Sequence, residues 1–180
     1  MSYSEIWAPW RMAYIQQDKE EEISQKKLIF SPDADPTCFI CQAAADTPEN
    51  DSQRYVIYRG ETALVIMNRF PYNNGHLLIT PRRHISRLDL LTPEEHLELM
   101  DLLAKMIKIL EETIHPEGFN AGLNLGHVAG AGLPGHLHWH LVPRWNGDTN
   151  FMPILASVNV IPQSLDSLWK LLYDKINNAE

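Results

Sequence analysis

The sequence has 180 residues, of which 44% are hydrophobic and 21% are charged. A chain of this length and composition buries roughly 70% of its unfolded surface in one domain, which excludes a disordered chain and a disulfide-stapled miniprotein. Its 15 Lys and Arg against 23 Asp and Glu give a formal net charge of -8. That balance argues against a protein that coats nucleic acid, although it still permits a basic pocket.

No segment of the sequence has the character of a membrane span or a signal peptide. The longest aliphatic run, Ala63 to Met67, is far too short to cross a bilayer, and the N-terminus lacks an apolar segment with a cleavage site. The only cysteines, Cys38 and Cys41, are too close together for a fold-stapling disulfide. Their spacing suits a metal knuckle or a redox pair in a reducing compartment, so we expect a cytoplasmic protein.

Residues 1–37 are expected to form an N-terminal arm, and residues 38–180 a single domain. The arm begins with aromatic residues, whose tryptophans could pack on the domain or on a dimer mate, or could stack against a substrate base. After the arm, short β-rich runs separated by turn residues predict three strands of an antiparallel meander, over 55–58, 62–68 and 76–80.

The strongest helix signal in the sequence follows this meander. Thr92 can cap the helix, Pro93 suits its first position and Glu95 completes a capping box. Apolar residues then recur at helical spacing as far as Ile114, just before a proline stops the pattern.

Two further strands are expected over 119–126 and 137–143, separated by a glycine-rich loop, and a final helix begins near Ser164. Strands grouped before and after one long helix indicate an α+β fold. We expect a mostly antiparallel sheet of about five strands, with the long helix and the C-terminal helix packed on it.

Three histidines, His136, His138 and His140, alternate with apolar residues. On a strand, alternate side chains point to one face and lie roughly 6.6 Å apart, so the three imidazoles would gather there. One possible chemistry is a catalytic zinc held by three imidazoles, with an open position for water. The other is nucleophilic attack by an imidazole on phosphorus, which the glycine-rich loop containing Gly130 and Gly132 favours because its N–H groups can approach phosphate oxygens.

The pattern His-φ-His-φ-His-φ-φ over 136–142, where φ is apolar, resembles the signature of the histidine triad (HIT) superfamily of nucleotide hydrolases and transferases. The likeness extends to residues 68–71 and 75–84. Within the superfamily, residues 7–11 and 140–151 resemble most the bacterial diadenosine tetraphosphate phosphorylase branch. This resemblance implies a HIT-like fold and a homodimer.

The resemblance also implies a reaction. Diadenosine tetraphosphate would be cleaved through a covalent nucleotidyl-histidine on His138, and inorganic phosphate as acceptor would give ADP and ATP. Water as acceptor would give AMP and ATP. A phosphoanhydride already has a good leaving group, so a catalytic metal is not strictly required. The alternatives are a HIT-type hydrolase of dinucleoside polyphosphates or nucleoside phosphoramidates, and a nucleotide-binding module without turnover.

Roles for single residues follow from their places in the family pattern. His138 would be the nucleophile, His140 would contact the phosphate and leaving-group oxygens, and His76 would lie near the nucleophile and favour its reactive tautomer. The expected substrate-binding residues are Asn68 for the ribose, Asn124 where some members have Gln, Gly130 and Gly132 in the loop, and Arg144 for the polyphosphate or an acceptor anion.

Cys38 and Cys41 form a second candidate site, which could bind a metal ion. In zinc-containing relatives such a pair is completed by two histidines, at positions that match His84 and His136. The resulting Cys₂His₂ set is closed, so its zinc would be structural. A reduced pair without metal is the alternative, and His136 would then support the nucleophile through hydrogen bonds.

Overall fold

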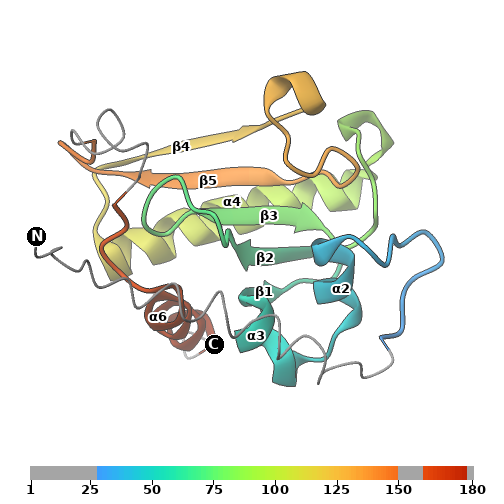
Figure 1. Ribbon diagram of the computed structural model, residues 1–180, viewed down its shortest axis with the longest axis horizontal. Helices are drawn as coiled ribbons and strands as arrows, with labels where there is room; N and C mark the ends of the chain where they lie inside the picture. The colour runs from blue at the N-terminus through green and yellow to red at the C-terminus, as the bar shows by residue number, and fades with distance from the viewer. Residues whose placement is uncertain (1–27, 150–159, 178–180) are drawn as a thin grey trace, which may run out of the picture.

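The computed structural model describes residues 28–149 and 160–177, which form an antiparallel sheet with helices on both faces (Figure 1). The strand order is β1-β2-β3-β5-β4. The strands are β1 (Val56–Arg59), β2 (Ala63–Met67), β3 (Leu77–Pro81), β4 (Gly118–Leu123) and β5 (Trp139–Arg144). The expected α+β fold with an antiparallel sheet of about five strands is confirmed.

The main helix, α4 (Pro93–Ile114), lies behind the sheet in Figure 1, and α6 (Leu165–Asn177) lies beside β1. The predicted capping box is present: Thr92 Oγ1 accepts a hydrogen bond from Glu95 N–H, and the Glu95 carboxylate accepts one from Thr92 N–H. Two short helices, α2 (Phe39–Ala45) and α3 (Asp51–Arg54), lie near β1 and β2. None of the helices in the described ranges is long and apolar enough to cross a membrane.

The structure differs from the sequence expectations at several places. The strand expected from 137 begins only at Trp139, because the backbone of Leu137 bonds to Ile85 O and to the Thr80 hydroxyl instead. The strand expected over 119–126 ends at Leu123, before the loop turns. The short helices α2 and α3 have no counterpart among the expected elements. Most of the N-terminal arm, residues 1–27 with its tryptophans, lies outside the described residues.

Both faces of β2 are buried, which explains its continuous apolar sequence. Alternate side chains, including Val65, belong to the main core that the sheet shares with α4 and α6. The side chains between them, Leu64 and Ile66, pack instead with Ile40 and the two cysteines in a second core under α2. The sheet therefore separates two cores, and the smaller one surrounds the cysteine pair.

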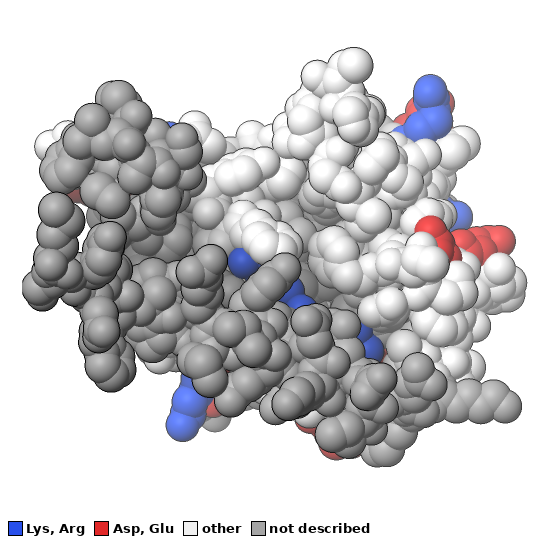
Figure 2. Space-filling view, in the orientation of Figure 1, with Lys and Arg blue, Asp and Glu red and all other residues white. Residues whose placement is uncertain are grey.

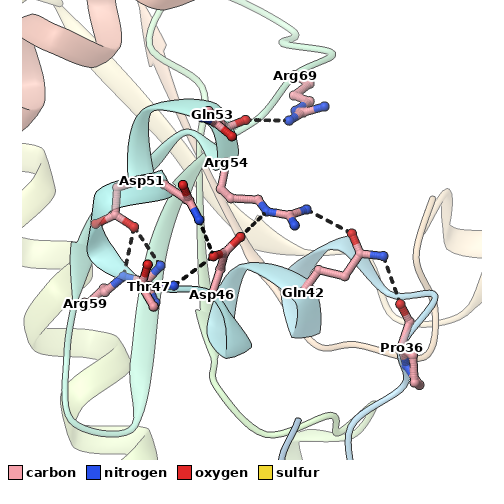
Figure 3. A network of polar contacts seen from close by, with 10 residues as sticks. Pro36, Gln42, Asp46, Thr47, Asp51, Gln53, Arg54, Arg59 and Arg69 are labelled. Carbon is pink, nitrogen blue, oxygen red and sulfur yellow. Dashed lines mark hydrogen bonds and ion pairs between the residues drawn. The ribbon is translucent and has the colours of Figure 1, made fainter. Parts of the chain in front are cut away.

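A network of polar contacts attaches α2 to α3 (Figure 3). Asp46, just after α2, accepts hydrogen bonds from Asn50 Nδ2 at 2.6 Å and from Arg54 Nε at 2.9 Å. Arg54 also donates to the Gln42 side chain on α2 at 3.0 Å. Beside this network, Arg59 of β1 pairs with the buried carboxylate of Asp51 on α3. These bonds fix the helix that carries Cys41 against the edge of the sheet.

Replacement of Gly75 by alanine tests how tightly the turn before β3 is packed. Gly75 has φ +76°, and a Cβ there would lie 2.7 Å from Ile114 Cδ1 and 3.1 Å from Pro143 Cγ. We expect Gly75→Ala to lower the free energy of unfolding by about 1–3 kcal/mol, measured by denaturant titration. Gly118→Ala is the control, because nothing lies within 4 Å of a Cβ at that position. Equal effects of the two substitutions would contradict the packing argument.

Candidate active site

His138 is held in one tautomer by the backbone of the residue two before it. Its Nδ1 lies 2.7 Å from the carbonyl oxygen of His136. A carbonyl only accepts hydrogen bonds, so Nδ1 of His138 carries the proton. In the neutral ring the other nitrogen, Nε2, then has a free lone pair, which is what a nucleophile needs. The side chain is buried, so its ring has little rotational freedom.

A chain of hydrogen bonds sets the tautomers of two further histidines. Tyr72 N–H donates to His76 Nδ1 at 3.1 Å, which requires that His76 carries its proton on Nε2. His76 Nε2 in turn lies 2.9 Å from His140 Nδ1 and donates to it. The proton of His140 is therefore on Nε2, and that buried atom has no hydrogen-bond partner among the described residues. An unpaired buried donor is costly unless a ligand supplies the acceptor.

The rings of His138 and His140 are adjacent, with centroids 5.0 Å apart. An electrophile placed between them would face the lone pair of His138 Nε2 and the N–H donor of His140 Nε2. The expectation that all three histidines gather on one face of a strand needs correction, because His136 and His138 precede β5. The side chain of His136 points instead to the cysteine pair, where its Nδ1 lies 3.3 Å from Cys38 Sγ.

The hydrogen bond from His76 also differs from the expectation. It was expected to favour the reactive tautomer of the nucleophile, but it is made to His140, while the carbonyl of His136 orients His138. Asn68 lies beside His76. Its Nδ2 is 3.3 Å from His76 Nδ1, and its Oδ1 accepts a hydrogen bond from Phe70 N–H.

Burial keeps the linked imidazoles neutral. It lowers the pKa of His76 to about 3, with a smaller contribution from the neighbouring His140 and His138. Burial likewise lowers the pKa of His140 to about 4, reinforced by His138. Near neutral pH both rings therefore act as hydrogen-bond donors and acceptors and carry no positive charge.

Four side chains form a second cluster next to the histidines: Cys38, Cys41, His84 and His136. Their ligand atoms all lie within 4.8 Å of one another, so the four could hold a metal ion. Both thiols and His136 are buried. Burial raises the pKa of the Cys41 thiol to about 11, which leaves it protonated when no cation is bound.

The three-imidazole catalytic metal site considered from the sequence does not fit this geometry. His136 Nε2 donates to the carbonyl oxygen of Pro81 at 2.9 Å, and its Nδ1 faces both thiols. Both ring nitrogens of His136 are thus engaged away from His138 and His140. One ion cannot take a ligand from all three rings in this arrangement.

The other expected site residues lie around the histidines. Arg144 and Asn124 line a groove of about 300 Å³ that also contains His140. In the glycine-rich loop, Gly130 N–H donates to His127 O, so this donor is already used inside the loop. Gly132 is exposed, and nothing lies within 4 Å of where its Cβ would be. In Figure 2 the protruding loop at the top centre is white, so it presents no Lys, Arg, Asp or Glu on this face.

Three residues of the site were not found from the sequence. Tyr72 supplies the backbone donor for His76, and its ring stacks against that of His140 at a centroid distance of 5.7 Å. Asp148 and Asn120 both accept hydrogen bonds from Arg144. These residues lie in a turn, a loop and an edge strand, where no periodicity marks them.

The neutral histidines make stability depend on pH. The folded-state pKa values of His76 and His140 lie below the ordinary value of 6.5, so the unfolded chain takes up protons first as the pH falls. This contribution is complete above about pH 6.5 and is lost progressively as the pH falls toward the lowered values of about 4 for His140 and about 3 for His76. Urea unfolding between pH 7 and pH 5 should show falling stability, with a smaller slope in His76→Gln. The same slope in both proteins would contradict the assignment.

The chain is similar in sequence to known proteins. The family model for the HIT domain matches residues 48–147. An AP-4-A phosphorylase from Mycobacterium tuberculosis is 38% identical over 167 residues, which cover 93% of this chain and 81% of the relative. A bis(5'-nucleosyl)-tetraphosphatase (asymmetrical) from Schizosaccharomyces pombe is 33% identical over 93 residues, which cover 52% of this chain and 50% of that protein.

Solved structures show the same fold. The crystal structure of a Zn-bound histidine triad family protein from Mycobacterium smegmatis has a TM-score of 0.56 and 26% identity, covering 70% of this chain and 88% of that one. The resemblance seen in the sequence, including that to the AP-4-A phosphorylase branch, is thereby confirmed. The chain belongs to the HIT family.

Proposed function

We propose that this protein cleaves a dinucleoside polyphosphate by transferring a nucleotide to His138 and then to inorganic phosphate. One observation carries the proposal: a nitrogen with a free lone pair on His138 lies beside a buried N–H donor on His140 that has no partner among the described residues. The similarity to an enzyme named AP-4-A phosphorylase supports phosphate as the acceptor and diadenosine tetraphosphate as the substrate.

In the first step, His138 Nε2 attacks the α-phosphorus of diadenosine tetraphosphate. A nitrogen–phosphorus bond forms, and the bond from phosphorus to the bridging oxygen breaks, with its electron pair leaving on ATP. The proton on His138 Nδ1 stays in its hydrogen bond to His136 O, which stabilises the ring as it becomes positive. His140 Nε2–H donates to an oxygen of the reacting phosphate.

In the second step, an oxygen of inorganic phosphate attacks the same phosphorus, and the nitrogen–phosphorus bond breaks. The electron pair returns to His138 Nε2, the ring becomes neutral, and ADP is released. The sum is diadenosine tetraphosphate plus phosphate to ADP plus ATP. Of the substrate-binding residues, Asn68 would contact the ribose, and Asn124 with the loop backbone at Gly132 would contact phosphate oxygens. Gly130, whose N–H is bonded to His127 O, would shape the loop and not donate to phosphate.

Phosphorolysis and hydrolysis are distinguished by nucleotide chromatography. The purified protein is incubated with diadenosine tetraphosphate, with and without inorganic phosphate. We expect ADP and ATP only when phosphate is present, and a loss of turnover of about 10³-fold or more in His138→Ala.

AMP and ATP without phosphate would make the protein a hydrolase, as the name of the fission-yeast relative suggests for that protein. Turnover of a nucleoside phosphoramidate alone would favour the phosphoramidate hydrolase. Tight binding without any turnover would favour a nucleotide-binding module.

We also propose that Cys38, Cys41, His84 and His136 hold a structural zinc ion. A tetrahedral zinc with ordinary bond lengths separates sulfur and nitrogen ligands by about 3.5 Å. The sulfur–nitrogen distances here are 3.3 Å, 3.3 Å and 3.5 Å, so the donor set fits. The four ligands would close the coordination shell, and zinc would bind the thiols as thiolates. Free cysteines so placed fit a reducing compartment such as the cytoplasm.

Zinc content and thermal unfolding test this site. We expect about one zinc per chain by atomic absorption, and both lost zinc and a lowered melting temperature in His84→Ala and Cys41→Ala. His127→Ala is the matched control, because His127 is exposed in the glycine-rich loop, outside the cluster. A metal-free wild type with the same melting temperature before and after chelation would contradict the proposal.

A homodimer is part of the same proposal. Strand β4 forms one edge of the sheet, and its sequence GFNAGL contains no charged residue. Monomeric proteins usually protect such an edge with charges, proline or a covering segment. The uncharged edge therefore favours pairing with a second copy, which light scattering of the purified protein measures directly.

A further inference from the structure

The groove beside His140 extends beyond the residues that the proposed chemistry uses. It runs along β4 and β5, and its lining includes Tyr72, Asn120, His140, Val142 and Arg144. Its volume of about 300 Å³ lies at the small end of the range for ligand pockets. It has room for one group of about nucleoside size, and it is continuous with the site of phosphate chemistry through His140.

Arg144, at the end of the groove away from His140, is held rigidly in place. Its Nε and Nη2 donate to the two carboxylate oxygens of Asp148 at 2.6 Å and 2.9 Å. Its Nη1 donates to Asn120 Oδ1 at 2.8 Å. Asp148 is itself fixed by Asn73 Nδ2 and by Trp145 N–H. The edge of the guanidinium is therefore largely occupied, while 46% of the Arg144 side chain stays exposed.

This pairing changes what Arg144 can bind. The guanidinium holds the pKa of Asp148 far below its ordinary value, so the carboxylate stays ionised and balances the arginine charge. The rest of the lining consists of amides, an aromatic ring, aliphatic side chains and His140, which burial keeps neutral. The Arg144 end of the groove therefore has no unbalanced positive charge to offer to a phosphate group. A guanidinium fixed by its edge offers its flat face, which stacks well on an aromatic ring.

From these observations we infer that the groove binds the nucleoside on the departing half of the substrate, with its base stacked on the guanidinium of Arg144 and hydrogen-bonded by Asn120. The inference rests on the proposed function and deepens it by naming the residues that would recognise the second nucleoside of the dinucleotide. Arg144 is then a specificity residue for the second nucleoside, which replaces its expected role as an anion site.

The span of the groove suits this assignment. His140 and Arg144 are four residues apart on β5, a distance of about 14 Å along an antiparallel strand. The transferred phosphate lies at the His140 end. A nucleoside at the other end must be separated from it by the remaining phosphates. A short polyphosphate chain is long enough to bridge this distance, and a single anhydride bond is not.

Two substrates that differ only in the second nucleoside test the inference. One is diadenosine tetraphosphate, and the other is adenosine 5'-tetraphosphate carrying a methyl ester on its terminal phosphate, which has the same number of charges. We expect kcat/KM of the wild type to be about tenfold higher for the dinucleotide, the size of one base-stacking contact. Wild-type turnover of both substrates at equal kcat/KM would overturn the inference and leave the proposed function intact. Turnover of neither would overturn both.

Arg144→Lys separates stacking from charge, because lysine keeps the positive charge and lacks the flat guanidinium. We expect the ratio of the two kcat/KM values to approach one in Arg144→Lys and to fall in Asn120→Ala. Asn177→Ala is the matched control, since it makes the same chemical change on α6, which packs near β1 at the opposite edge of the sheet. Melting temperatures verify that each variant is folded. An unchanged ratio in Arg144→Lys would overturn the inference.

Discussion

His136 makes three sets of contacts, one through its backbone and two through its ring. The histidine cluster and the cysteine cluster of the site both depend on these contacts. The His136 carbonyl oxygen accepts the Nδ1 proton of His138, the His136 Nε2 donates to Pro81 O on β3, and its Nδ1 faces the two thiols. One residue thus joins the second core to the nucleophile. A bond from a backbone carbonyl is also hard to lose by side-chain motion, so the reactive tautomer of His138 is fixed by the fold itself.

The electrostatics of the site follow from burial more than from charge. The linked histidines have lowered pKa values because they are removed from water, and they lie beside one another as neutral rings. A neutral His140 stabilises a phosphate oxygen as a hydrogen-bond donor, without the desolvation cost of a buried cation. At the far end of the groove Arg144 is charged, but Asp148 balances it. The chain as a whole is acidic, but its site is nearly neutral. Recognition of an anionic substrate there depends on directed hydrogen bonds and on stacking.

Much of the fold followed from local patterns in the sequence. The helix from Pro93 to Ile114 was predicted to its boundaries, because a capping box and a proline mark its ends. The start of β5 was misplaced, because tertiary bonds from Leu137 to Ile85 and Thr80 override the alternating pattern. The residues that meet at the histidines and at the cysteines were largely named from the resemblance to the HIT family, which matched His84 and His136 to the cysteine pair. Asp148 and Tyr72 were not, because their roles depend on which loops the fold brings together.

The most direct measurement for this account is mass spectrometry of the protein quenched during its first turnover of diadenosine tetraphosphate. A phosphorus–nitrogen bond to imidazole survives in alkali and breaks in acid, so the digest is prepared at high pH. The account predicts an adenylyl group on the peptide that contains His138, which disappears after acid treatment and is not formed by His138→Ala. Steady turnover by a protein that never carries nucleotide on that peptide would contradict the account, because phosphate would then attack the substrate directly.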